Sequence, residues 1–205
     1  MKAERPDAVP IQGGTDVMVE LNFDRGRPSA LLNLNEVPEL RGWWRENGRL
    51  RLASGLTYTE AMEVPLAEAA PALAEASRTV GGPQIRNRGT IGGNLGTASP
   101  AGDTLPPLLV YGAEVELTST RGSRTVPLRD FLVGPKRNAL EQDELIVAVR
   151  IPVPGLVTAP LKERDELPER VAEAASPIDD VRGTARYRRH ALRVLTERAL
   201  ERSLA

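Results

Sequence analysis

The sequence contains no cysteine among its 205 residues. Without a thiolate, the chain cannot form a disulfide, hold an iron–sulfur cluster through cysteine or build a cysteine-bound zinc site. The single histidine, His190, lies far along the C-terminal segment. Any iron–sulfur cluster or zinc site that needs cysteine ligands would therefore belong to another chain.

Long apolar runs and an excess of charge of one sign are missing too. No stretch of about eighteen apolar residues is present, so no membrane span is expected, and the first eight residues lack the apolar centre of a signal peptide. The formal net charge of -1 argues against nucleic-acid binding, which needs excess positive charge. We expect a cytoplasmic protein that contacts neither membrane nor nucleic acid.

Side chains for acid–base or nucleophilic catalysis are scarce. With His190 alone, the chain offers no Ser-His-Asp arrangement and no H-E-x-x-H metal motif. Asp179 and Asp180 are adjacent carboxylates, but no other ligand cluster accompanies them, so we favour capping or arginine pairing over metal binding. We predict no catalytic side chain and no metal site.

Glycine is concentrated in residues 84–103, which read Q-I-R-N-R-G-T-I-G-G-N-L-G-T-A-S-P-A-G-D. Glycine lets the backbone take positive φ and lets another group approach the main chain, and successive free amides in such a turn bind anions. Asp103 would suit a ribose diol, because a carboxylate accepts two hydrogen bonds. A glycine-rich surface loop between strands would explain the same composition.

A second glycine turn lies at residues 10–17, which read P-I-Q-G-G-T-D-V. Two separate turns of this kind can hold one diphosphate from two sides. Neither turn has the P-loop spacing or the G-x-G-x-x-G dinucleotide fingerprint. The residues therefore predict a phosphate-bearing ligand without naming it.

Both turns resemble those of the FAD-binding subunit of the molybdenum hydroxylases, the medium or flavoprotein subunit of the carbon monoxide dehydrogenase and xanthine dehydrogenase type. Four stretches carry the resemblance in order, over roughly residues 9–153: I-Q-G-G-T-D-V, V-G-G-P-Q-I-R-N-R-G-T-I-G-G-N-L-G-T-A-S-P-A-G-D, F-L-V-G-P-K-R-N-A-L and E-L-I-V-A-V-R-I-P. The T-I-G-G-N-L element, with an aspartate ten residues after its last glycine, is quite specific.

The resemblance implies non-covalent FAD and a set of binding residues. The residues that would line the diphosphate come from both turns: Gly13, Gly14, Thr15, Asp16, Thr90, Ile91, Gly92, Gly93 and Asn94. Thr97 would lie near the flavin or the diphosphate, and Asp103 would hold a sugar or ribityl hydroxyl.

The function implied by the resemblance is that of an oxidoreductase subunit. It would pass electrons from partner iron–sulfur and molybdenum-cofactor subunits through flavin to an external acceptor. One alternative is a non-enzymatic remnant that acts as an assembly or interaction module, because the family's C-terminal domain is largely missing here. Another is a stand-alone flavin oxidase or reductase, for which the chain offers no substrate base.

The fold is expected to be α+β. A small N-terminal strand–helix unit and a larger, mostly antiparallel sheet with helices would form the PCMH-type flavin fold that the resemblance implies. We expect two FAD-binding subdomains at 1–54 and 55–153, a linker at 154–175, and a remnant C-terminal segment with a terminal helix at 176–205.

Local patterns predict the elements within these segments. Thr15 or Asp16 is expected to cap a helix over 16–23, and a second helix ending at residue 79 is expected to begin or kink at Pro71. Trp43 and Trp44 are expected to be partly buried packing residues. The predicted strands are 9–12, 30–35, 50–53, 114–119, 124–128 and 144–151, and the other main helices are 105–111 and 185–203.

Overall fold

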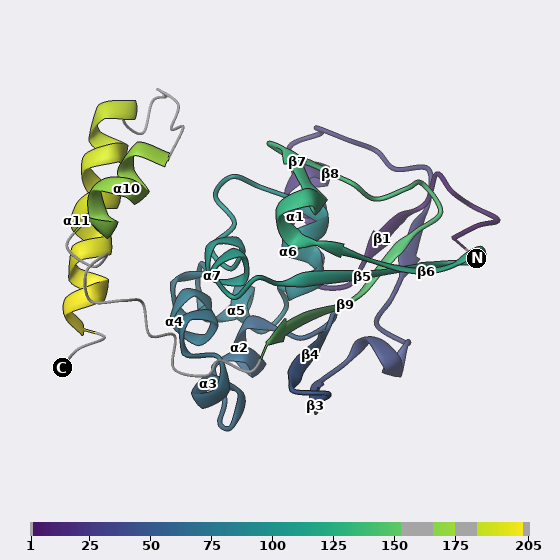
Figure 1. Ribbon diagram of the computed structural model, residues 1–205. Coiled ribbons are helices and arrows are strands. Elements are labelled where there is room, and N and C mark those ends of the chain that lie inside the picture. The colour runs from purple at the N-terminus through teal and green to yellow at the C-terminus, as the bar shows by residue number, and fades with distance from the viewer. Residues whose placement is uncertain (1, 153–165, 175–183, 203–205) are drawn as a thin grey trace. The chain divides into compact units, whose positions relative to one another are not determined.

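The structure, a computed structural model, describes residues 2–152, 166–174 and 184–202. The chain divides into two compact units, residues 1–154 and 155–205. Figure 1 shows the helices and strands of both units, and each unit is described by itself below.

The first unit begins with a small strand–helix–strand motif. Strands β1 (Val9–Ile11) and β2 (Leu31–Asn33) pair in parallel, and helix α1 (Thr15–Asn22) connects them. The predicted helix is confirmed, but its predicted side-chain cap is wrong: Gly14 occupies the N-cap with φ of 75° and no side-chain cap hydrogen bond is present. Glycine suits this position because it has no Cβ atom, and a Cβ atom would be strained in a left-handed backbone conformation.

A five-stranded antiparallel sheet forms the centre of the first unit. Its order is β3 (Trp43–Glu46), β4 (Arg49–Ala53), β9 (Leu145–Pro152), β5 (Glu114–Ser119) and β6 (Gly122–Pro127). The β3–β4 hairpin turns through Asn47 and Gly48, both at positive φ, as a two-residue hairpin loop of this type requires. Because β4 pairs with β9, the sheet runs across the subdomain boundary expected after residue 54, and that boundary stays a prediction.

The inner face of the sheet builds the core together with short helices. Leu50, Leu117, Val149 and Ile151 from the strands are fully buried, as are side chains from the helical segments such as Leu73. The remaining elements are η1 (Pro38–Leu40), α2 (Tyr58–Ala61), α3 (Leu66–Ala69), α4 (Pro71–Thr79), α5 (Pro83–Arg86), α6 (Ile91–Thr97), α7 (Leu105–Val110), α8 (Leu128–Phe131), β7 (Leu132–Gly134) and β8 (Arg137–Asn138).

Several predicted boundaries match these elements. Helix α4 begins at Pro71, as the position of that proline predicts. Figure 1 shows α2, α4, α5 and α7 gathered beside the sheet. Trp43 packs against the core while remaining partly exposed, as expected. The same expectation is wrong for Trp44, which is exposed.

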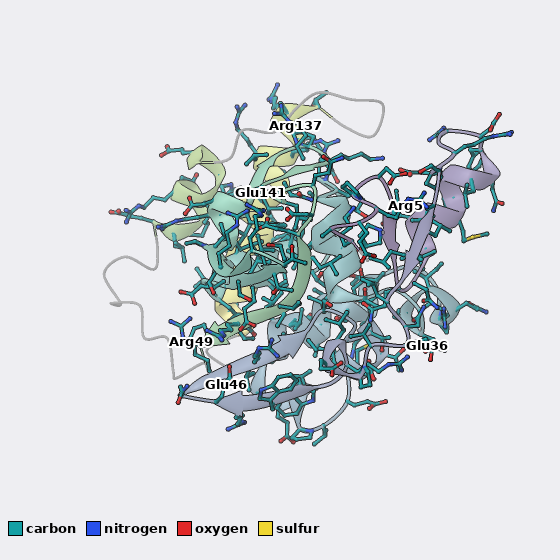
Figure 2. All side chains as sticks on the ribbon, turned by 90° about the vertical axis from the view of Figure 1, so that its right-hand side faces the viewer. Arg5, Glu36, Glu46, Arg49, Arg137 and Glu141 are labelled. Carbon is teal, nitrogen blue, oxygen red and sulfur yellow. The ribbon has the colours of Figure 1, made fainter. Side chains whose placement is uncertain are left out.

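Charged side chains occupy the outer face of the sheet. Arg51 donates to both carboxylate oxygens of Glu116, at 3.0 and 2.8 Å, and Arg150 pairs with the same carboxylate. The Trp44 ring lies 4.7 Å from the guanidinium carbon of Arg51. Figure 2 shows Glu46 and Arg49 at one end of this outer face. The ladder of opposite charges leaves the outer face polar while the inner face builds the core.

The second unit contains helices α10 (Leu167–Ala174) and α11 (Ala185–Arg202). The terminal helix is confirmed. The segment 154–175, expected to be a linker without a periodic apolar pattern, contains helix α10 at 167–174, and its role as a linker stays a prediction. Residues 167–174 carry a proline near the first turn and then strong helix formers, which together favour a helix. Residues 154–165 and 175 of the expected linker, and Asp179 and Asp180, lie outside the described residues.

No helix within the described ranges combines the length and apolar content needed to cross a bilayer. Exposed side chains of α11 include Tyr187 and Leu195. Few side chains of this unit are buried: among its described residues, Pro168 is the only buried one.

One ion pair in the first unit should make its stability depend on pH. Arg124 donates to Glu144 at 2.6 and 2.7 Å, and Glu144 is buried. The hydrogen bond from Arg124 lowers the pKa of Glu144, while burial acts in the opposite direction. Because the folded pKa lies below the unfolded one, the stabilisation is present above the unfolded pKa and is lost as pH falls through the folded pKa.

We predict that Glu144→Gln lowers the free energy of unfolding at neutral pH by about 1.5–3 kcal/mol, the range for hydrogen bonds to charged groups. The variant should also lose less stability than the parent when the pH falls below the unfolded pKa. Urea unfolding at a series of pH values measures both effects, with the exposed Glu36→Gln as control. Parallel pH profiles for the parent and Glu144→Gln would contradict the prediction.

Candidate functional site

Both glycine turns line one cavity of about 440 Å³, a size typical of small-molecule sites. The wall also includes apolar side chains from β1 and from the start of β9, such as Ile11 and Ile146. Nine of the eleven predicted site residues line it: Gly13, Gly14, Thr15, Asp16, Thr90, Gly92, Gly93, Asn94 and Thr97. The structure therefore brings together two segments that are far apart in the sequence.

The first turn packs directly against the second. A Cβ atom built at Gly13 would overlap the carbonyl oxygen of Arg88, one residue before Gly89. Glycine is required here because the two main chains approach too closely for any side chain. This contact sets the first turn beside the segment that leads into α6.

Amides of the first turn are open. Within the described part of the chain, the amides from Gly13 to Val17 donate no hydrogen bond, and Met18 is the first to donate, to the Gly14 carbonyl at 2.9 Å. Successive free amides at the start of a helix carry partial positive charge and favour an anion. The first turn therefore has the donors that a diphosphate needs.

The amides of residues 91–94 in the second turn are not open, and the expectation of free amides is wrong for them, whereas the Thr90 amide donates no hydrogen bond within the described part of the chain. Ile91 donates to the Leu56 carbonyl at 2.9 Å, and Gly92 to the Ser54 carbonyl at 2.7 Å. The Gly93 amide donates to the Thr90 hydroxyl at 3.0 Å, and the Asn94 amide to the Thr90 carbonyl at 3.0 Å. The start of α6 is thus bonded to the loop at 54–56 and capped by Thr90.

Glycine in the second turn serves close packing rather than anion binding. A Cβ atom built at Gly92 would lie 2.7 Å from the Ser54 carbonyl oxygen, closer than any real side chain is found. Ile91 is fully buried in the core and does not line the cavity. The start of α6 therefore forms a wall in which the amides of residues 91–94 already donate hydrogen bonds within the protein.

Polar side chains of the site are bonded to one another. The Thr97 hydroxyl donates to the Asp16 carboxylate at 2.7 Å, and the Thr104 hydroxyl donates to the Asn94 side-chain oxygen at 2.7 Å. Asp103 is exposed and does not line the cavity. Its charge nevertheless acts on the site, as the environment of Tyr58 shows.

Tyr58 and Ser54 line the cavity without having been predicted. Tyr58 is 6% exposed, and burial raises the pKa of its hydroxyl, with smaller contributions from the charges of Asp16 and Asp103. The Ser54 hydroxyl is buried and has no hydrogen-bond partner among the described residues. Both residues lie in the segment 54–58, whose sequence has no glycine pair or phosphate motif that would single it out.

Lys136 is the only basic residue among the described residues that line the cavity. It lies between β7 and β8 at φ of 54°, an unusual value for a residue with a side chain. Its amide donates to the Ala98 carbonyl at 2.9 Å, and Asn138 donates through its side chain to the Gly96 carbonyl at 2.8 Å. The hairpin is therefore attached to the C-terminal end of α6.

Charge in the cavity wall is negative apart from Lys136. Asp16, Glu20 and Glu144 line it, although Arg124 pairs with Glu144. An anionic ligand would therefore depend on the open amides of the first turn and on Lys136. These donors, together with the apolar wall, fit a dinucleotide that carries a diphosphate and aromatic rings. No group of three or more histidine, aspartate or glutamate side chains that could hold a metal occurs in the described ranges.

Known proteins are similar to this chain in sequence and in fold. Residues 1–154 match the family described as FAD binding domain in molybdopterin dehydrogenase. The xanthine dehydrogenase FAD-binding subunit of Escherichia coli O157:H7 is 38% identical over 152 residues, which cover 73% of this chain and 52% of that protein. The nicotinate dehydrogenase FAD-subunit of Eubacterium barkeri is 39% identical over 158 residues, covering 75% and 53%.

Solved structures agree on the fold. Carbon monoxide dehydrogenase from Oligotropha carboxidovorans matches with a TM-score of 0.89 at 25% identity, covering 96% of this chain and 89% of that chain. Quinoline 2-oxidoreductase from Pseudomonas putida 86 matches with a TM-score of 0.89 at 23% identity, covering 98% and 90%. The predicted α+β class is confirmed.

The chain spans about half the length of the relatives that it matches in sequence. The matched half contains both glycine turns, the central sheet and the whole cavity wall. FAD is the cofactor of this family, and the fit of the cavity to a dinucleotide agrees with it. The chain belongs to the family of FAD-binding domains of the molybdopterin dehydrogenases.

Proposed function

We propose that this chain is the FAD-holding subunit of an oxidoreductase complex of the molybdenum hydroxylase type. It would receive electrons from partner subunits that carry iron–sulfur clusters and a molybdenum cofactor, and pass them through the flavin to an external acceptor. Family membership supports this proposal, as do relatives described as FAD subunits. The absence of cysteine supports it too, because a cysteine-bound cluster would have to lie on another chain.

The single observation that carries the proposal is the row of open amides from Gly13 to Val17 at the wall of the cavity. We propose that these amides bind the FAD diphosphate. Thr90, Gly92, Gly93 and Asn94 would form the opposite wall. Non-covalent FAD would supply the redox chemistry, and the chain would bind and orient it.

A second candidate is an interaction module without flavin chemistry. The slight burial in α10 and α11 favours it, as do the exposed Tyr187 and Leu195 of α11. Such a helix pair is suited to packing against a partner protein. This candidate predicts co-purification with a partner and no bound flavin.

Purification with added FAD tests the two candidates against each other. We expect about one FAD per chain, visible as flavin absorption bands and released on denaturation because the cofactor is not covalently attached. Reduction of the bound flavin by the partner subunits would then test the electron-transfer role. A colourless protein that fails to bind FAD at micromolar concentration would reject the proposal and favour the interaction module.

We predict that Gly13→Ala weakens FAD binding, because the new methyl group would collide with the Arg88 carbonyl and push the first turn away from the second. Overpacking of this kind costs about 1–3 kcal/mol, so the dissociation constant should rise about 5- to 150-fold. Titration of flavin fluorescence measures the change. Gly26→Ala is the matched control, because no atom lies within 4 Å of a Cβ at that position, and equal affinities of the two variants would contradict the prediction.

We also predict that Lys136→Met weakens binding of FAD but not of riboflavin, which lacks phosphate. A charge-assisted contact with phosphate contributes about 1.5–3 kcal/mol, so FAD affinity should fall about 10- to 150-fold, and its salt dependence should decrease. Arg137→Met is the control, because Arg137 is the neighbouring exposed cation and does not line the cavity (Figure 2). An equal loss for FAD and riboflavin would show that Lys136 does not act on phosphate.

A further inference from the structure

One hydrogen bond joins the helices that follow the two glycine turns. The hydroxyl of Thr97, at the end of α6, donates to the carboxylate of Asp16, in the first turn of α1, at 2.7 Å. These residues are 81 positions apart in the sequence, and both line the cavity. The bond therefore connects opposite walls of the site directly.

The wall formed by the first turn has little other support. Helix α1 contains no buried residue, and Met18, Val19 and Phe23 on it or just after it are exposed. The parallel pair of β1 and β2 has only two strands, which is a marginal arrangement without further packing. A specific contact to the wall formed by α6 is thus needed to hold the open amides at a fixed distance from α6.

The chemistry of Asp16 also argues against a direct role in binding a diphosphate. A carboxylate repels an anion, so its presence beside the open amides needs another explanation. The hydrogen bond from Thr97 provides that explanation, because the Thr97 hydroxyl on α6 needs an acceptor and the Asp16 carboxylate on α1 supplies it. Thr97 is likewise engaged by this bond rather than directed only at a ligand.

We propose that Asp16 and Thr97 form a latch, a pair of positioning residues that fixes the width of the cavity. This inference rests on the proposed function, since FAD is the ligand whose binding the latch controls. It replaces the role of cofactor contact that the family resemblance assigns to the two residues. The bond sets the geometry, and the charge of Asp16 is a disadvantage for an anionic ligand.

A double-mutant cycle tests the latch. Asp16→Ala and Thr97→Val should each weaken FAD binding, about 10- to 150-fold if the bond has the usual strength of a charge-assisted contact. The double variant should bind no more weakly than the weaker single variant, because either change alone removes the bond. Additive losses would overturn the latch, since they would mean that each residue contacts the cofactor independently.

FAD binding by conservative variants distinguishes the latch from a role of these residues in the stability of the fold alone. Thr97→Ser keeps the hydroxyl and should restore binding. Asp16→Asn keeps an acceptor for the Thr97 hydroxyl, so it should bind FAD more tightly than Asp16→Ala. Equally weak binding by Asp16→Asn and Asp16→Ala would overturn the latch and return Asp16 to the role of a ligand whose charge is needed. Thr59→Val removes a comparable hydroxyl bond, to Asn87 at 2.6 Å, outside the cavity and serves as control.

Hydrogen exchange separates failure of the latch from failure of the proposed function. In the protein without FAD, Thr97→Val and Asp16→Ala should each accelerate amide exchange in α1, and the double variant should accelerate it no further. If the parent binds no FAD, the proposed function fails, while the exchange data still decide whether the bond holds α1. Unchanged exchange in both single variants would overturn the latch.

Discussion

The anchoring of α6 to the loop at 54–56 is the constraint on which the site depends. Two main-chain hydrogen bonds, from Ile91 and Gly92 to the carbonyls of Leu56 and Ser54, place the second glycine turn directly after strand β4. The contact is possible only because Gly92 has no side chain. Since β4 pairs with the central strand β9, the position of this wall is inherited from the core of the sheet.

The two glycine turns, although similar in composition, thus have different structural roles. In the second turn the amides of residues 91–94 donate hydrogen bonds within the protein. The amides of the first turn stay open, and its helix α1 contains no buried residue. Preorganised donors bind charge well only if they are held in place. The few contacts between the walls, at Gly13 and between Asp16 and Thr97, therefore matter more than their number suggests.

Local sequence predicted the positions of helices and strands better than it predicted which main-chain amides remain free to bind a ligand. Turn glycines, the helix after the first turn and the strand at 145–152 follow from composition and periodicity within a few residues. The sequence does not reveal that the amides of Ile91 and Gly92 donate hydrogen bonds within the protein, because their acceptors are main-chain carbonyls more than thirty residues earlier. Tyr58 and Lys136 were missed for the same reason: tertiary packing alone brings them to the cavity.

The sparse packing of the β1–α1–β2 motif links its order to cofactor occupancy. A ligand that binds only the ordered form shifts the equilibrium toward that form by mass action. The segment around α1, which buries no side chain of its own helix, would then be more open to proteolysis when no ligand is bound.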